Sequence, residues 1–334
     1  MSETQFAQQF GKVHQEMART MVGCDQAIRD LLVCFIAGGN LLIESMPGLG
    51  KTLLAKVLAN VLEVKFSRIQ FTPDLMPADI IGTNIIVEDD QGRKHIQFQR
   101  GPVFTHILLA DEINRATPKA QSALLEVMQE HSVTVAGIRH IVEEPFIVIA
   151  TQSLMDTEGT YSLPEAQLDR FFFKIILPSP DRESLKEISR RTTGLEVRRV
   201  AKVLDAPQVV ELRRQARRVS VPAVVRQYAS RLILATHPET PGAPPDIARF
   251  VRYGASPRGV QALILAGKIQ ALLAGRGEVQ VEDIAAMAMP ALRHRIIANY
   301  EGEAEKIDLD GLVRIVLAHV DAKASRTVPK AFQT

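Results

Sequence analysis

The sequence lacks long apolar runs and holds only two cysteines among its 334 residues. The longest uninterrupted apolar run covers residues 31–37, whereas a membrane-spanning helix requires roughly 20 residues. Two cysteines, Cys24 and Cys34, cannot by themselves form a disulfide framework or a zinc site. The polar segment 1–17 lacks the apolar core of a secretory signal, so we expect a cytoplasmic protein with no membrane span.

The composition is that of a soluble globular chain, with 46% hydrophobic and 23% charged residues. It excludes a disordered or collagen-like chain, and the length predicts about two domains. Strand-like and helix-like patterns alternate as far as residue 178, and helical periodicity dominates beyond it. We therefore expect an α/β domain over 1–178, a smaller helical domain over 179–322 and a tail over 323–334.

Positive charge is concentrated in residues 182–231, which hold 13 lysines and arginines against 5 acidic residues. Such a stretch can bind nucleic acid, form the solvated face of helices or meet an acidic neighbour. Its one aromatic residue is Tyr228, whereas single-stranded nucleic acid is bound on interleaved aromatic side chains. The pattern favours a solvated helical surface over a nucleic-acid site.

Apolar runs predict the main elements of the first domain. Residues 118–130 form a helix with Thr117 as cap and Pro118 at its first position. Two hairpin insertions are expected at 82–101 and 132–142, each around a turn-rich segment. The other predicted elements are strands at 40–43, 64–71, 106–110, 146–151 and 173–177 and helices at 52–62 and 163–172.

The strongest local pattern is the segment 45–52, Ser-Met-Pro-Gly-Leu-Gly-Lys-Thr, between a predicted strand and a predicted helix. This is the setting of a phosphate-binding loop, whose amides and helix N-terminus form an anion site. Lys51 would reach the β- and γ-phosphates, and the Thr52 hydroxyl would bind Mg²⁺. Ser45 replaces the usual first glycine, and we expect nucleotide binding to survive because serine fits that position at negative φ. The loop residues assigned to the nucleotide are Ser45, Pro47, Gly48, Leu49, Gly50, Lys51 and Thr52.

A second motif follows downstream, where the apolar strand 106–110 ends in Asp111 and Glu112. In a phosphate-loop enzyme the first acid helps to hold Mg²⁺. The second can polarise the attacking water as a general base. The pair therefore favours hydrolysis over transfer of the phosphoryl group to a small molecule.

Together these motifs resemble the AAA+ ATPases, and within them the MoxR branch. The resemblance implies a parallel five-stranded sheet with helices on both faces, followed by an all-α lid. With the phosphate loop, its motifs spread over residues 45–258. The stretches that carry it are 67–75 (SRIQFTPDL), 101–104 (GPVF), 109–115 (LADEINR), 158–161 (EGTY), 163–171 (LPEAQLDRF) and 254–258 (GASPR).

The resemblance also implies partners and cofactors. MoxR-like proteins are similar to chaperone ATPases that bind ATP and Mg²⁺ and assemble as hexameric rings. They often act with a protein that carries a von Willebrand factor A domain, and they assist the maturation or assembly of a client. The two hairpin insertions would then line the ring pore or face the client.

The resemblance also implies roles for individual residues. Arg170 matches the arginine finger, which would neutralise transition-state charge at the γ-phosphate of a neighbouring subunit. Arg258 matches the sensor arginine of the second domain, and Ser256-Pro257 place it at a helix start. Arg115 is a candidate contact with an adjacent subunit. Val22, Gly23 and Leu53 are expected beside the nucleotide.

Two positions depart from the family pattern. Gln152-Ser153-Leu154 stands where the family has Gln-Asn-Pro, with asparagine as the first sensor. Ser153 is shorter by about one bond and would orient the attacking water less directly, so we expect slow hydrolysis. Cys24 stands where a glutamine commonly follows Val22-Gly23, near the expected adenine pocket.

Three other functions stay open at this stage. A nucleic-acid motor or loader would use the basic stretch, but the chain shows no helix-turn-helix or zinc module. A weakly hydrolysing, nucleotide-dependent scaffold would explain Ser45 and Ser153, against the intact Lys51, Asp111 and Glu112. The ATPase subunit of a metal chelatase shares the ring and the hairpins, but the segment 254–258 favours the MoxR type.

Overall fold

The computed structural model describes residues 2–153, 160–194 and 200–327. The chain divides into two compact units, and α8 (Ala206–Arg218) contributes to both. The first unit comprises residues 8–171 and 175–213, and the second comprises 1–7, 172–174 and the chain from 214 onward. The predicted domain boundaries at residues 178 and 322 stay predictions.

A parallel five-stranded sheet forms the centre of the first unit, in the order β2-β5-β8-β1-β9. Its inner strands β5 and β8 are buried on both faces, which explains their nearly continuous apolar sequences. Because the strands are parallel, their carboxyl ends lie along one edge of the sheet. The strands are β1 (Leu41–Ser45), β2 (Phe66–Gln70), β5 (Ile107–Asp111), β8 (Ile147–Ser153) and β9 (Phe173–Ile176).

Two of the predicted helices in this region differ from their predictions. Thr117 makes no side-chain capping bond, although α5 begins at Pro118 as expected. The helix predicted over 163–172 is short, because Pro164 precedes it and β9 begins at Phe173. The helices are α1 (Glu3–Ala18), α2 (Asp25–Ala37), α3 (Lys51–Val61), α4 (Pro77–Ile81), α5 (Pro118–Glu130), α6 (Glu165–Leu168) and α7 (Arg182–Thr192), with the 3-10 turn η1 (Ile113–Arg115).

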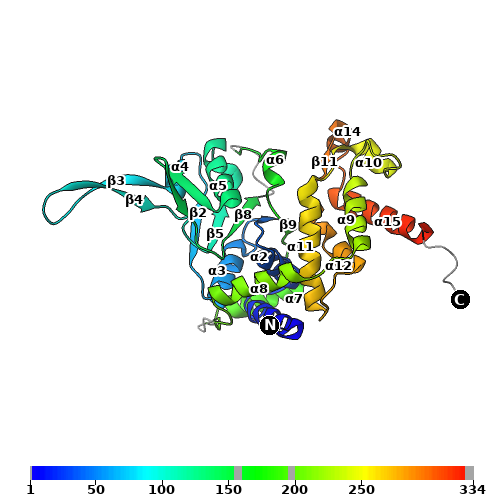
Figure 1. Cartoon of the computed structure of the whole chain (residues 1–334), viewed down its shortest axis with the longest axis horizontal. Helices are drawn as coiled ribbons and strands as arrows, with labels where there is room; N and C mark the ends of the chain where they lie inside the picture. The colour runs from blue at the N-terminus through cyan, green and yellow to red at the C-terminus, as the bar shows by residue number, and fades with distance from the viewer. Residues whose placement is uncertain (1, 154–159, 195–199, 328–334) are drawn as a thin grey trace. The chain divides into compact units, whose positions relative to one another are not determined.

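Both predicted hairpins are present, and they expose apolar side chains. The first, β3 (Gly82–Glu88) with β4 (Lys94–Arg100), projects from the first unit in Figure 1. Ile86 and Ile96 are paired across it, and each is 73% exposed. The second, β6 (Ser132–Val135) with β7 (Ile138–Ile141), exposes isoleucines at both ends of its second strand.

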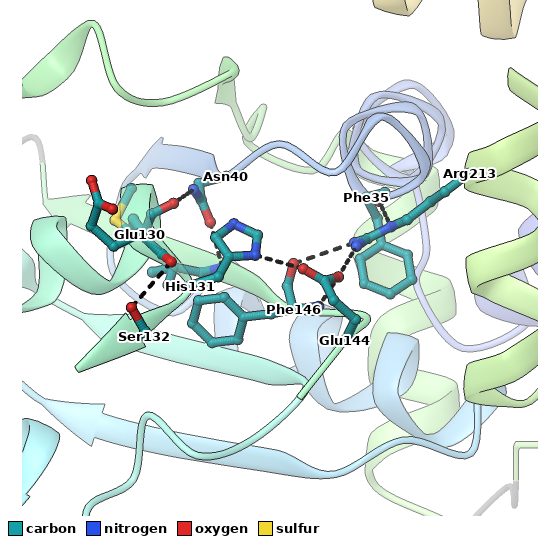
Figure 2. Close-up of polar contacts among 10 residues, drawn as sticks. Phe35, Asn40, Glu130, His131, Ser132, Glu144, Phe146 and Arg213 are labelled. Atoms are coloured by element: carbon teal, nitrogen blue, oxygen red, sulfur yellow. Dashed lines mark hydrogen bonds and ion pairs between the residues drawn. The ribbon is translucent and has the colours of Figure 1, made fainter. Parts of the chain in front are cut away.

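The base of the second hairpin is held by a polar network (Figure 2). Glu144 contacts His131 Nδ1 through one carboxylate oxygen and Arg213 Nη1 through the other, both at 2.5 Å. Arg213 on α8 also donates to the carbonyls of Phe35, near the end of α2, and Phe146, immediately before β8. The network therefore joins α2, the segment 131–146 and α8, which are distant in sequence.

The second unit is largely helical, in agreement with the predicted lid, and α9, α11, α12 and α15 pack together within it. Two short strands, β10 (Val251–Tyr253) and β11 (Ile297–Ala298), pair antiparallel. Among the described residues no helix is both long and apolar enough to cross a membrane. The helices are α9 (Ala223–Leu234), α10 (Pro245–Phe250), α11 (Pro257–Leu273), α12 (Val281–Ala286), α13 (Ala288–Leu292), α14 (Tyr300–Ala304) and α15 (Leu309–Thr327), the last of which extends into the predicted tail.

Candidate functional site

The candidate phosphate loop turns between β1 and α3 as the sequence predicts. Gly48 and Gly50 have φ of +82° and +81°, a conformation that strains any residue with a Cβ. Ser45 is fully buried at the end of β1 and is not among the non-glycine residues with positive φ. Serine therefore fits this position without backbone strain. Lys51 opens α3 and its Nζ lies 3.5 Å from the carbonyl oxygen of Ser45, over the loop.

The acidic pair lies at the same edge of the sheet, at the end of β5. Thr151 of the neighbouring strand β8 joins its two members. The Thr151 hydroxyl donates to Asp111 Oδ1 at 2.7 Å and accepts from the backbone N–H of Glu112 at 2.9 Å. Glu112 has a positive φ of 58°, and such strained backbone persists where surrounding contacts impose it. Since Thr151 is fully buried, it fixes both acids in place.

Two side chains on β2 complete the acidic cluster. Arg68 donates through Nε and Nη2 to Asp111 Oδ2, at 3.1 and 2.8 Å. Gln70 accepts from Arg68 Nη2 at 2.6 Å and donates to Glu112 Oε2 at 2.8 Å. Sequence reasoning missed Thr151, Arg68 and Gln70 as site residues. Their position near the carboxyl ends of strands flanking β5 was the available signal.

Arg115 also contacts the acidic pair. Its Nε lies 3.3 Å from Glu112 Oε2, one turn further along the chain. The arginine is therefore placed beside the candidate general base within its own chain. The predicted contact with an adjacent subunit stays a prediction.

A cavity of about 370 Å³ opens beside the phosphate loop, within the size range of small-ligand sites. It brings the predicted Val22 and Gly23 together with Gly50 and Leu53. Cys24 also lines it, and burial raises the pKa of this thiol, which keeps it protonated at neutral pH. Other lining residues were not predicted and come from segments before α2 and around α7: Thr20, Met21, Pro178, Pro180, Leu185, Ile188, Arg191 and Thr192.

The donor set of the site fits Mg²⁺. Asp111 and Thr52 offer oxygen atoms, the ligand type that Mg²⁺ prefers. Within the described part of the chain, no group of three or more His, Cys, Asp or Glu side chains could hold a metal ion.

Arg170 contacts α5. Its Nη1 donates to the carbonyl of Leu125 at 3.4 Å and to the side chain of Gln129. Its Nε is buried and has no hydrogen-bond partner among the described residues. With Gln167, Arg170 lines a separate cavity of about 320 Å³. The geometry does not bring Arg170 to the phosphate loop of its own subunit.

Arg258 and Ser153 are the remaining predicted residues. Arg258 belongs to the second unit, where its backbone N–H donates to the Ser256 hydroxyl at 3.1 Å at the start of α11. Ser153 ends β8 and is paired with Ser45 of β1, and its side chain lies outside the described part of the structure. Leu154 also lies outside the described residues.

The basic stretch is partly neutralised within the chain. Arg190 and Arg191 both contact Glu187, and Arg213 contacts Glu144. The hydrogen bonds and charges of the two arginines lower the Glu187 pKa to about 2, although burial opposes the shift. These pairs account for part of the local charge without a nucleic-acid ligand.

Comparison with known proteins agrees with this geometry. Residues 40–173 match the model of the ATPase family associated with various cellular activities (AAA), and residues 246–319 match the AAA lid domain. The fold and site thus define an AAA ATPase.

Proteins that are similar along most of the chain identify the branch of the AAA family. Chaperone MoxR1 of Mycobacterium tuberculosis is 40% identical over 94% of this chain and 82% of its own. Protein MoxR of Methylorubrum extorquens is 32% identical over 93% and 94% of the two chains. The crystal structure of a protein from Cytophaga hutchinsonii, assigned as an ATPase, superposes with a TM-score of 0.87 at 37% identity, covering 95% and 96% of the two chains. The chain belongs to the MoxR family of AAA ATPases.

Proposed function

We propose that this protein hydrolyses ATP with Mg²⁺ at the edge of the sheet where β1, β5 and β8 end. The observation that carries the proposal is the Thr151 hydroxyl, which holds Asp111 and the backbone of Glu112 at once. Glu112 would accept the proton of the attacking water, and Lys51 would balance charge on the phosphates. Mg²⁺, held through Thr52 and Asp111, would neutralise charge that develops on the β- and γ-phosphates.

The active form in this proposal is a ring, with six subunits as in the family. Arg170 contacts α5 rather than the phosphate loop of its own subunit. It would reach the γ-phosphate of a neighbouring subunit, and Arg258 would serve as the sensor of the second unit. Hydrolysis would then depend on assembly, because a lone subunit lacks the arginine that stabilises the transition state.

The work of the ring would be that of a chaperone, which remodels or matures a client protein or complex. One relative is named as a chaperone. The hairpins offer exposed apolar contacts, since Ile86, Ile96 and Ile141 are each more than 70% exposed. A protein with a von Willebrand factor A domain is the proposed partner, as in the family. No observation favours the nucleic-acid motor.

The test is the Mg²⁺-dependent release of phosphate from ATP, measured per subunit over a wide range of protein concentration. The control is Glu112→Gln, which keeps the shape of the site and removes the general base. A rate that rises with concentration and vanishes in the control would support a shared hydrolytic site. A rate equal to that of the control at every concentration would reject ATP hydrolysis by the isolated protein and leave the scaffold function.

A further inference from the structure

The carboxylate of Asp111 has a partner on each oxygen. Oδ1 accepts from the buried Thr151 hydroxyl, and Oδ2 accepts two N–H groups of one guanidinium, that of Arg68. The Asp111 side chain is only 10% exposed. A carboxylate so removed from water requires a positive partner, and within this chain Arg68 is that partner.

The two partners differ in how easily they can leave. Thr151 is completely buried on the inner strand β8, so its bond to Oδ1 is fixed. Arg68 stands on the edge strand β2, and its side chain is 45% exposed. Its one other hydrogen bond in the cluster goes to Gln70, which is also exposed. The guanidinium can therefore move into water without disturbing the core.

Mg²⁺ and Arg68 would compete for the negative charge of the Asp111 carboxylate. The proposed function assigns Asp111 to Mg²⁺, which keeps several waters and needs room around the carboxylate. With Oδ1 committed to Thr151, Oδ2 is the oxygen that remains, and two cations cannot share it without strong repulsion.

We propose that Arg68 is the resident counter-ion of Asp111, which the site exchanges for Mg²⁺ when the metal–nucleotide complex binds. The inference rests on the proposed function and deepens it, since it assigns a positioning residue to the metal half of the site. With Arg68 in place, the γ-phosphate of metal-free ATP meets a neutralised carboxylate. When the metal arrives, Arg68 must be released, and its release weakens metal binding.

Removal of this arginine should therefore change the dissociation constants of metal-free and metal-bound ATP in opposite directions. In Arg68→Gln, metal-free ATP meets an uncompensated Asp111 and should bind more weakly. The metal complex has no resident cation to displace and should bind more tightly. The ratio of the two dissociation constants, metal-free over metal-bound, is expected to rise about tenfold or more over wild type.

The experiment measures binding of a fluorescent ATP analogue to the full-length chain, in EDTA and in excess Mg²⁺, with no need for turnover. Arg68→Lys keeps the charge and should leave the ratio near the wild-type value. Arg93→Gln is the matched control, because Arg93 is exposed and pairs with Asp89 at the turn of the first hairpin. It should leave both constants unchanged.

Each outcome separates the two proposals. If wild type fails to bind the analogue in either buffer, nucleotide binding itself is rejected and the proposed function falls. If wild type binds and Arg68→Gln shows an unchanged ratio, Arg68 is not the exchanged counter-ion and this inference alone falls. Weaker binding by the same factor in both buffers would also overturn it, because it would make Arg68 a phosphate ligand.

Discussion

Thr151 is the side chain on which the acidic cluster depends at the scale of single residues. Its hydroxyl is the only group that bonds both Asp111 and the Glu112 backbone in the described hydrogen bonds. Thr151→Val keeps the shape and removes both bonds. It leaves a poorly compensated N–H and carboxylate, at a cost of about 1–3 kcal/mol in the free energy of unfolding.

We expect Thr151→Val to lower kcat by about 10- to 100-fold, because a small displacement of catalytic groups is enough for such a loss. Steady-state ATPase kinetics with thermal unfolding as a parallel readout would measure both effects. Thr151→Ser retains the hydroxyl and serves as the control. A Val variant with wild-type kcat would show that Thr151 does not position Glu112.

The second prediction for a single residue concerns Ser153. It ends β8 beside Ser45, where the family has the asparagine that orients the attacking water. Ser153→Asn restores the family residue, so we expect a higher kcat with unchanged nucleotide affinity. A variant that assembles normally and hydrolyses no faster would contradict the sensor role of this position.

At the residue scale, local backbone geometry was predictable where the pattern lies within one short segment, whereas the functional roles of these residues stay predictions. Gly48 and Gly50 adopt the positive φ that the phosphate-loop pattern requires, and Asp111 and Glu112 end a strand as expected. Arg68 lies 43 residues from Asp111 in sequence. Such a contact depends on strand order, which no single segment encodes.

At the scale of elements, the second hairpin is fixed by the Glu144 network at its base (Figure 2). Burial raises the Glu144 pKa, but the His131 hydrogen bond, the Arg213 charge and the Phe146 N–H outweigh it, and the net pKa is lowered. A lowered pKa in the folded state means that the ionised carboxylate stabilises the fold above the ordinary glutamate pKa. This stabilisation is lost as pH falls through the lowered value.

Glu144→Gln should therefore lower the free energy of unfolding at neutral pH, by on the order of 1 kcal/mol after allowance for solvent screening. The difference between the free energies of unfolding of the variant and wild type should become smaller as pH falls below about 4.5. Denaturant unfolding at a series of pH values measures it. Glu143→Gln is the control, since Glu143 and its partner Lys65 are both about two-thirds exposed and should contribute little. If the difference in free energy of unfolding stays constant to pH 3, the ionised Glu144 carboxylate is not its cause.

The elements themselves were mostly predictable, because each rests on local periodicity. The bounds of α5 and both hairpins agree with the sequence patterns. The helix predicted over 163–172 covers only Glu165–Leu168 in the structure. Phe171 is buried by tertiary packing, and the residues that follow form β9. The link from Glu144 to Arg213 joins segments 69 residues apart and could not be read from sequence.

At the scale of the whole molecule, the proposed active site is shared between two subunits. Glu112 would come from one subunit and Arg170 from its neighbour. Glu112→Gln and Arg170→Ala should then each abolish hydrolysis for different reasons. In a mixed ring, an Arg170→Ala subunit supplies an intact Glu112, and an adjacent Glu112→Gln subunit supplies an intact Arg170.

The most direct measurement is the ATPase rate of an equal mixture of these two inactive variants, after subunit exchange. We expect activity to return, at up to about one quarter of the wild-type rate for random mixing in a closed ring. The control is each variant alone at the same total concentration. A mixture that exchanges subunits and stays as inactive as its components would contradict a site shared between Glu112 and Arg170.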